Sequence, residues 1–393
     1  MKKILSALLR ALLVCGIATG CVKGSENGDG NGGFSIIPKK EYHQNPLTGF
    51  EQGSDYKSGQ RPVAIMVNNI MSGDSKENSW PQKGLSDADL VYEMETEGGI
   101  TRYMAVYRDW TKIPDVGPIR SARDQFVQLM IPMNCLYVHD GGSTYAKALL
   151  ERYSYSDKDL TPNLGISYRD TTLSGTRSWE HTEFTSGELI TRAVEDESNG
   201  LSTSYTEPAN VFDWVLYDEP ARTLSGIDVS EIYWNFSKSY AAKLTYNREN
   251  NTYTKEHINL ASRFSHQMVD GNKDNRPVEF DNAFVLWTTI ERYPDGILSN
   301  VNLSWGGIGY YFNGGKVEKV RWLKGEPNEP LRIVSLDGTE TDIKINPGKS
   351  YVAIVSLDYF GTYSFDGQVV DSSGDYTPVE EIEAEEGQEA TEE

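Results

Sequence analysis

The chain has 393 residues, 58 of them acidic and 37 basic, and a formal net charge of −21. Acidity of this size argues against nucleic acid as a direct partner. Of its three cysteines, Cys15 and Cys21 lie in or beside the leader segment, so only Cys135 remains in the body of the chain. The sequence therefore predicts a mature protein that folds without an internal disulfide.

The first twenty residues have the pattern of a secretory signal peptide. Lys2, Lys3 and Arg10 supply positive charge, and small or apolar residues fill the rest. The segment ends Ala-Thr-Gly before Cys21, which resembles a lipobox, although alanine stands where leucine is usual. We expect residues 1–20 to be removed and Cys21 to carry lipid that anchors the protein outside the cell membrane. The alternative is ordinary cleavage nearby, which would leave Cys21 as a free thiol.

A linker, a two-part body and a tail follow. Residues 21–60 are rich in small polar residues and predict a flexible linker. Residues 61–203 predict a mixed α/β domain, which opens with an apolar run typical of a central strand. Residues 204–365 hold short strand-like runs between turns and predict a smaller, mainly antiparallel β domain. Residues 366–393 contain eleven acidic residues and no lysine or arginine, which predicts a disordered tail.

Residues 89–107 consist of two alternating runs joined by two adjacent glycines. This pattern predicts a β-hairpin, because glycine permits the positive φ angles of a two-residue turn. In that register Glu95 lies opposite Arg102, and Glu97 lies opposite Ile100.

The predicted hairpin gathers three carboxylates on one face. Glu93, Glu95 and Glu97 would share this face with Arg102. The face could be a cleft for ligand binding or acid/base chemistry, or a solvated surface with one salt bridge. A competing interpretation of the segment is a helix capped by Ser86.

A helix is expected to begin near Ala122, because Ser121 and Asp124 fit a capping box, and to end by Pro132. Arg120 would then flank the helix entrance together with Arg123.

This arginine pair lies at the positive end of the helix dipole, where a cation is disfavoured. An anion bound between Arg120 and Arg123 would explain the arrangement. The anion is either a ligand or the hairpin glutamates, which would make a buried Arg–Glu network.

A third candidate group follows the short apolar strand at residues 135–139. A glycine turn and a helix over residues 144–153 come next, and ligands of α/β proteins bind where such strands end. His139 and Asp140 are therefore candidates for acid/base or ligand contacts, and Ser143 for the helix N-cap. A single His-Asp pair is weak evidence for a metal, so no metal site is predicted.

His181 lies in a polar loop with Trp179 and Glu183 nearby, ahead of a helix at about residues 186–196. A histidine in such a loop is either a functional group or an ordinary surface residue. The sequence contains no P-loop, HExxH or GxSxG motif, and we predict no cofactor.

Several segments carry a family resemblance when they are taken together: the apolar run into Asn68-Asn69, Tyr92-Glu93, residues 97–102, 116–123 and 138–143, and, more diffusely, Gly307 to Gly309, Trp322 to Lys324 and the Asn-Pro-Gly at 346–348. They resemble the YerB-like family of bacterial lipoproteins, built from the DUF3048 N-terminal and C-terminal domains of unknown function. The resemblance spans residues 61 to 357 and implies a membrane-anchored, extracytoplasmic, two-domain protein without an assigned activity. The family's usual His-Asn reads His181-Thr182 here, which leaves any role of that amide open.

Three hypotheses of function remain. The first is a non-catalytic protein that binds a polar or anionic ligand, a glycan of the cell envelope or a partner protein. The second is an envelope enzyme acting on a glycan or phosphate ester, with Glu93, Glu95 or His139 as acid/base group and the arginines as charge stabilisers. The third is an architectural role for the charged cluster. The predicted ligand-binding residues are Glu93, Glu97, Arg102, Arg120, Arg123, His139, Asp140, Ser143 and His181.

Overall fold

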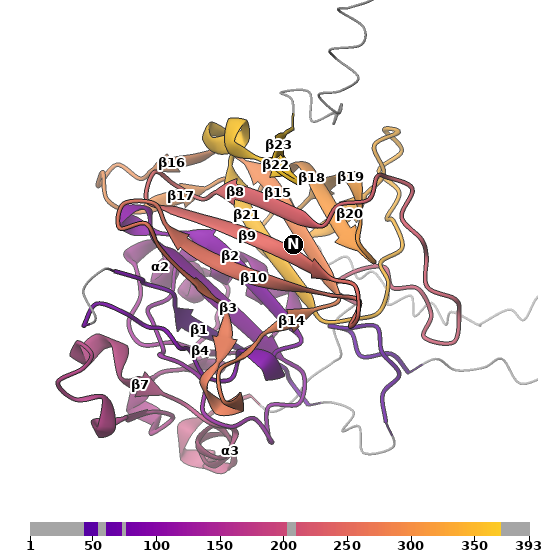
Figure 1. The fold of residues 1–393 in the computed structure, drawn as a ribbon. Coiled ribbons are helices and arrows are strands. Elements are labelled where there is room, and N and C mark those ends of the chain that lie inside the picture. The colour runs from indigo at the N-terminus through magenta and orange to yellow at the C-terminus, as the bar shows by residue number, and fades with distance from the viewer. Residues whose placement is uncertain (1–42, 54–59, 73–75, 203–209, 371–393) are drawn as a thin grey trace, which may run out of the picture. The chain divides into compact units, whose positions relative to one another are not determined.

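The structure is a computed structural model that describes residues 43–53, 60–72, 76–202 and 210–370 (Figure 1). The predicted signal peptide, Cys21, most of the linker and nearly all of the acidic tail lie outside the described residues. Within the described ranges, no helix combines the length and apolar character needed to cross a membrane.

The first part of the chain forms the buried centre of a large sheet. β1 (Val63–Asn68), β2 (Leu90–Glu95) and β3 (Thr101–Tyr107) are buried at every position, as the apolar run predicts for β1. β1 pairs antiparallel with β3 and parallel with β4 (Leu136–Val138), which pairs parallel with β5 (Asp159–Leu160).

Three α-helices accompany these strands: α1 (Asp124–Met130), α2 (Thr144–Arg152) and α3 (Gly187–Glu195). The side chains of Ser143 and Ser186 cap α2 and α3 by accepting backbone N–H groups, so the predicted N-cap role of Ser143 is confirmed.

The predicted start of α1 near Ala122 is wrong by two residues. Arg123 occupies the N-cap, and no side chain caps the helix. Ala122 is instead held by backbone hydrogen bonds to Gly141 and Ser143 on the neighbouring turn. These contacts keep residues 121–122 out of the helix, which overrides the local capping-box pattern.

The second part of the chain is almost entirely β. Its longer strands are β8 (Glu231–Asn235), β9 (Tyr240–Asn247), β10 (Thr252–Asn259), β11 (Phe264–Gln267), β15 (Asn282–Thr288), β18 (Gly307–Asn313), β19 (Lys316–Leu323) and β21 (Ser350–Ser356). Its short strands are β12 (Val269–Asp270), β13 (Arg276–Pro277), β14 (Glu279–Phe280), β16 (Ile290–Arg292), β17 (Ser299–Val301), β20 (Arg332–Val334), β22 (Ser364–Phe365) and β23 (Gln368–Val369). A further short pair, β6 (Tyr168–Arg169) and β7 (Glu183–Phe184), belongs to the first part.

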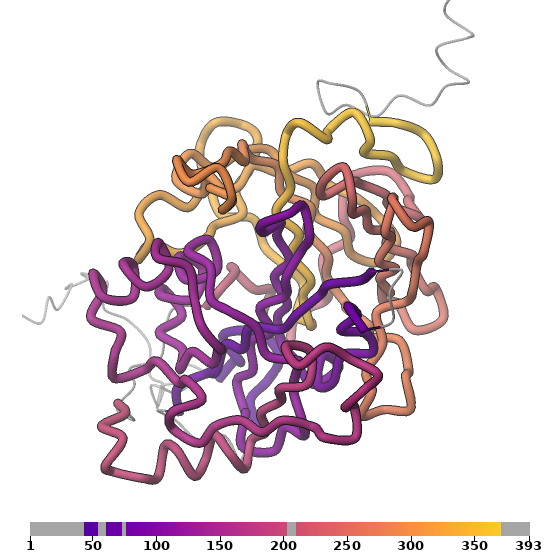
Figure 2. The backbone as a smooth tube through the Cα atoms, turned by 90° about the vertical axis from the view of Figure 1, so that its left-hand side faces the viewer, coloured from indigo at the N-terminus to yellow at the C-terminus, as the bar shows by residue number. Residues whose placement is uncertain are grey.

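A single ten-stranded sheet joins the two parts in the order β20-β19-β18-β15-β21-β2-β3-β1-β4-β5. The join is the parallel pair of β2 and β21, whose register runs from Leu90 opposite Ser350 to Met94 opposite Ile354. In Figure 2 the yellow C-terminal strand runs beside the indigo N-terminal ones. A second sheet, built around β11-β10-β9-β8-β22-β23, belongs to the second part alone.

Each face of the ten-stranded sheet has its own apolar core. On one face Leu90 and Met104 pack with Phe126 of α1 and Ala146 of α2. On the other, Val91 and Ala105 pack in a cluster with Ile190 of α3 and Trp234 of the second sheet. The predicted fold class, mixed α/β followed by mainly antiparallel β, is confirmed.

Candidate functional site

The predicted hairpin exists, but its register is wrong by one residue. Glu95 lies opposite Thr101, and Met94 lies opposite Arg102. The reason is the connection: a 3-10 turn over residues 97–99 replaces the two-residue glycine turn. Since side chains alternate along a strand, a shift of one residue moves Arg102 to the sheet face opposite that of Glu95.

As a consequence, the predicted charged residues do not converge on one hollow. Glu93 and Glu95 point towards the second-sheet side, whereas Arg102 points towards α1 and α2. The predicted residues, with Glu95 apart, separate into four clusters.

Glu93 lies in a sealed cluster between the two sheets. Its carboxylate is 2.8 Å from Nζ of Lys255 on β10, and both side chains are completely buried. Thr101 Oγ1 donates to it at 2.6 Å, Asn69 Nδ2 donates at 3.0 Å, and the Tyr351 hydroxyl also donates. Burial lowers the pKa of Lys255, while the neighbouring Glu93 opposes that shift. A carboxylate without access to solvent does not suit the catalytic or ligand-binding role that we predicted for it.

Glu95 lies further along the same strand face, closer to the surface. Arg292 of β16 covers it, with Nη2 2.7 Å from the carboxylate. Burial raises the pKa of Glu95, and the Arg292 charge opposes the rise. Glu95 is therefore paired under an arginine rather than free for catalysis.

Glu97 forms the second cluster with two of the predicted arginines. Arg102 Nη2 lies 2.7 Å from the carboxylate, and Arg123 contacts it with both Nε and Nη2. Burial alone would raise the pKa of Glu97, but the Arg123 hydrogen bond and both guanidinium charges outweigh it and lower the pKa to about 2. This is the Arg–Glu network left open by the sequence, and it occupies the charges that an anionic ligand would need.

The third cluster surrounds His181, which is fully buried rather than at the surface. Asn68 Nδ2 lies 2.8 Å from its Nδ1, and Glu77 Oε2 lies 3.1 Å from its Nε2. Arg120 does not join Arg123 but pairs with Glu180 at 3.0 Å.

Glu77, Glu180 and His181 hold one ligand atom each within 4.8 Å, a spacing that could suit a metal. The hydrogen bonds of His181 argue against a metal site. The Ile70 N–H donates to Asn68 Oδ1, so the Asn68 amide nitrogen must face His181. Nδ1 of His181 then accepts this bond, and Nε2 carries the proton donated to Glu77. A protonated Nε2 is not a metal ligand.

The fourth cluster surrounds His139, where β4 ends. His139 Nδ1 lies 2.7 Å from the carbonyl oxygen of Gly141, and Nε2 lies 2.6 Å from Oδ1 of Asp159. Both ring nitrogens therefore already face oxygen acceptors, and a proton transfer to a substrate would first have to open one contact. Asp140, next in the chain, pairs with Arg169 at 3.2 Å.

An open hollow of about 660 Å³ lies beside this histidine. We call it the His139 hollow; its polar lining is His139, Asp140, Lys147, Glu151, Ser154, Tyr155, Ser156, Asp159, Thr161 and Asn163. It lies at the carboxyl ends of the parallel strands β4 and β5, the position predicted from the strand-turn-helix pattern. Three carboxylates against one lysine make the lining net acidic.

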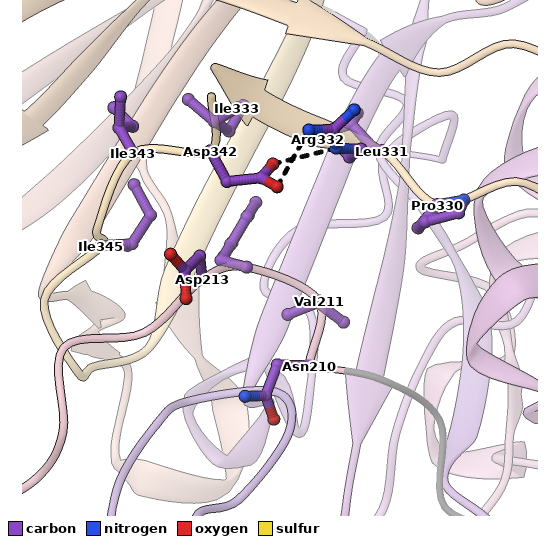
Figure 3. Close-up of a pocket in the computed structure, with 11 residues that line it drawn as sticks. Asn210, Val211, Asp213, Pro330, Leu331, Arg332, Ile333, Asp342, Ile343 and Ile345 are labelled. Carbon is purple, nitrogen blue, oxygen red and sulfur yellow. Dashed lines mark hydrogen bonds and ion pairs between the residues drawn. The ribbon is translucent and has the colours of Figure 1, made fainter. Parts of the chain in front are cut away.

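Another hollow, of about 370 Å³, has an apolar floor that includes Ile333, Ile343 and Ile345 (Figure 3). Its charged groups are already paired. Arg332 contacts Asp342 at 2.9 Å, and Asp213 contacts Lys344 at 2.8 Å. Asn210 is the remaining polar side chain of its lining, so this hollow offers fewer groups to orient a ligand than the His139 hollow.

Sequence reasoning missed Asp159, Lys255 and Glu180. Asp159 lies on a two-residue strand, too short to give an alternating pattern. Lys255 lies on the buried face of β10, which is mostly polar, so hydrophobic alternation gave no signal for it. Glu180 directly precedes His181 and could have been considered with it.

The chain matches known proteins over most of its length. A family model described as the N-terminal domain of a protein of unknown function (DUF3048) matches residues 47–202, and the corresponding C-terminal domain matches residues 232–352. The chain is 27% identical over 328 residues to "Putative lipoprotein YerB" of Bacillus subtilis strain 168, covering 79% of this chain and 85% of that protein. The crystal structure of YerB protein from Bacillus subtilis is similar at TM-score 0.63 and 25% identity, covering 82% of this chain and 99% of that one.

Proposed function

Because the chain belongs to the YerB-like family, whose two DUF3048 domains carry no assigned activity, we propose that it is an extracytoplasmic lipoprotein that binds a neutral, hydroxyl-rich glycan of the cell envelope. The His139 hollow is the proposed binding site. The observation that carries the proposal is its lining, in which carboxylate, amide and hydroxyl side chains meet at the carboxyl ends of β4 and β5.

The charges of the site favour a neutral ligand over an anionic one. Arg102 and Arg123 share Glu97, and Arg120 pairs with Glu180. The hollow itself is net acidic, so a phosphate-rich polymer would meet repulsion there. Carboxylates such as Asp159 and an amide such as Asn163 instead offer hydrogen bonds to sugar hydroxyl groups.

The site supports binding better than catalysis. Both nitrogens of His139 are engaged, and Glu93 and Glu95 lie outside the hollow, under Lys255 and Arg292. None of the three acid/base candidates predicted from the sequence is therefore both unpaired and in the hollow.

Calorimetric titration of the leaderless protein with a neutral cell-wall oligosaccharide tests the proposal. Asp159→Asn should weaken binding at least tenfold, because it removes a charged acceptor from the hollow. Asp157→Asn is the matched control, since Asp157 pairs with Lys158 and does not line the hollow. Equal affinities in the two variants would contradict the proposed site, as would tighter binding of a polyglycerol phosphate that is lost in Arg120→Ala.

The anchor is tested separately. The name of the Bacillus subtilis relative and the Cys21 motif support lipid attachment. In cell fractionation, Cys21→Ser should move the protein from the membrane to the soluble extracytoplasmic fraction. A variant that stays with the membrane would rule out Cys21 as the anchor.

A further inference from the structure

Trp305 presents its indole to solvent in a chain that buries most of its tryptophans. The residue is 76% exposed, whereas Trp214, Trp234, Trp287 and Trp322 are among the largest fully buried side chains. Keeping so large an apolar surface in water forgoes the stabilisation that burial would give. An exposed ring of this size is therefore informative when polar groups are arranged around it.

A small polar hollow lies directly beside this ring. It has a volume of about 270 Å³. We call it the Trp305 hollow; besides Trp305 its polar lining is Gln128, Thr289, Glu291, Asn300, Asn302 and Ser304. Gln128 comes from α1, and the others come from the β16–β17 region and the turn after it. Among the residues that the structure describes, no lysine or arginine lines the hollow.

Three of the polar side chains that line the hollow make no side-chain contact within the described part of the molecule. There, Gln128, Glu291 and Asn300 have no side-chain hydrogen bond and no ion pair. Other polar side chains of the β16–β17 hairpin do have partners. Arg292 contacts Glu95, and the Tyr293 hydroxyl donates to Asp124 at 2.7 Å. Free donors and acceptors are thus concentrated on the side that faces the hollow.

The ring face of Trp305 is also free, in contrast to that of the other highly exposed tryptophan. Trp179 is 71% exposed, but the Arg169 guanidinium lies 4.6 Å above its ring. Among the described residues, no aromatic or cationic group covers Trp305. Its backbone is fixed, because Asn302 Oδ1 accepts its N–H at 3.3 Å.

The scaffold under the hollow is held in place before any ligand arrives. Arg292 bridges Glu95 on β2 and Ser299 on β17, and the Ser299 hydroxyl donates to the Thr96 carbonyl at 3.0 Å. A site built on such a braced hairpin loses little conformational entropy when it binds.

We propose that the Trp305 hollow is a second carbohydrate site, which binds one sugar ring with its apolar face on the Trp305 indole and its hydroxyl or acetamido groups on Gln128, Glu291 and Asn300. An aromatic platform beside amide and carboxylate groups matches the two kinds of surface that a pyranose presents. The volume suits one ring, and the absence of a basic lining residue excludes a preference for anionic sugars.

The two sites are independent. The Trp305 hollow shares no residue with the His139 hollow, so either can fail without the other. If both bind, α1 flanks one site and α2 the other, and one polymer contacting both would gain avidity.

The test follows the Trp305 indole N–H signal by NMR while chitotetraose, a neutral N-acetylglucosamine oligomer, is added to the leaderless protein. Trp305→Phe identifies the signal by its loss. We expect the signal to shift in the wild type and equally in Asp159→Asn, in which the other hollow is impaired. By calorimetry, Trp305→Ala should lose at least tenfold in affinity for this site, Asn300→Ala should lose less, and Trp179→Ala should be unchanged.

Three outcomes would overturn the proposal. The first is an indole signal that does not move at saturating sugar. The second is a shift that disappears in Asp159→Asn, which would assign all binding to the His139 hollow. The third is an equal loss of affinity in Trp179→Ala and Trp305→Ala, which would indicate non-specific association with exposed indoles. An unchanged melting temperature in each variant shows that the fold is intact.

Discussion

Lys255 and Glu93 form an ion pair of 2.8 Å in which neither side chain reaches solvent. Lys255 comes from the second sheet and Glu93 from the ten-stranded sheet, so the pair joins the two regions that match the N-terminal and C-terminal family domains. Tyr103 and Tyr351 surround it, with the Lys255 ammonium donating to the Tyr103 hydroxyl at 2.9 Å. The charged centre is therefore a structural junction.

Removing one partner of this pair should be severely destabilising. Lys255→Met leaves an unpaired buried carboxylate, and we expect a loss of about 3–5 kcal/mol in the free energy of unfolding, measured by urea denaturation. Adding Glu93→Gln to Lys255→Met should recover much of that loss, because the double variant buries no charge.

The neighbouring surface pair provides the control. Glu256 of β10 contacts Lys243 at 3.0 Å, and both side chains are partly exposed. Glu256→Gln should cost less than about 1 kcal/mol. Additive effects of the two core substitutions would contradict a coupled pair.

Glu97 should make stability depend on acid pH. Its pKa is lowered from 4.5 to about 2: burial opposes the shift, but the Arg123 and Arg102 contacts outweigh it. The unfolded chain therefore binds more protons than the folded one in this range, so the stabilisation is present above pH 4.5 and is lost as the pH falls towards 2. A shift of this size corresponds to at most about 3 kcal/mol, and partial exposure reduces the expected loss to about 1–2 kcal/mol.

Urea denaturation between pH 7 and pH 2.5 measures this effect. Glu97→Gln should be less stable than the wild type at pH 7 and should flatten the acid part of the profile. Glu95→Gln is the comparison, because the pKa of Glu95 is raised and its contribution has the opposite sign. An unchanged acid slope in Glu97→Gln would show that other carboxylates dominate.

The sequence predicted those elements of the fold that depend on local signals. The apolar run of β1 and the Ser143 cap of α2 are local signals, and these elements formed as expected. The hairpin was equally visible, but two glycines permit more than one turn, and a single residue in the turn decided which face Arg102 occupies.

The long-range pairing of Lys255 with Glu93 could hardly be predicted from the local sequence. On β10 the inward positions are Tyr253, Lys255, His257 and Asn259, whereas Ile258 is only partly buried. Hydrophobic alternation would therefore have turned the wrong face of this strand inward. The polar face of β10 is buried only because it packs against Glu93 and its neighbours on the ten-stranded sheet, which lie more than 150 residues away in the chain.

Nε2 of His181, rather than Nδ1, should carry a ring proton. The Ile70 N–H fixes the Asn68 amide, and that amide in turn donates to Nδ1 of His181. The ¹⁵N chemical shifts of the ring should therefore show an unprotonated Nδ1 and a protonated Nε2.

The same hydrogen bonds predict that zinc does not bind to His181 and its neighbouring glutamates. Adding Zn²⁺ should leave the melting temperature of the wild type unchanged, because zinc on Nε2 would move the ring proton to Nδ1, which faces the Asn68 amide N–H, itself a donor. A rise in melting temperature that disappears in Glu77→Gln would instead identify a metal site at Glu77, Glu180 and His181.

The N-terminal half should not fold alone. In a fragment of residues 42–204, β2 loses its parallel partner β21 and becomes an open edge with unpaired backbone groups. Its inward Glu93 also loses Lys255 and Tyr351, which leaves a charge uncompensated.

We expect this fragment to give the poorly dispersed amide NMR spectrum of an unfolded or aggregating chain. It should gain native dispersion when residues 205–370 are co-expressed. The fragment carrying Glu93→Gln is the informative control: if it folds alone, the charge is the main obstacle, whereas continued failure assigns the obstacle to the exposed strand edge. A well-dispersed spectrum from the unmodified fragment would show that the β2–β21 junction is dispensable and that the two family domains fold as separate units.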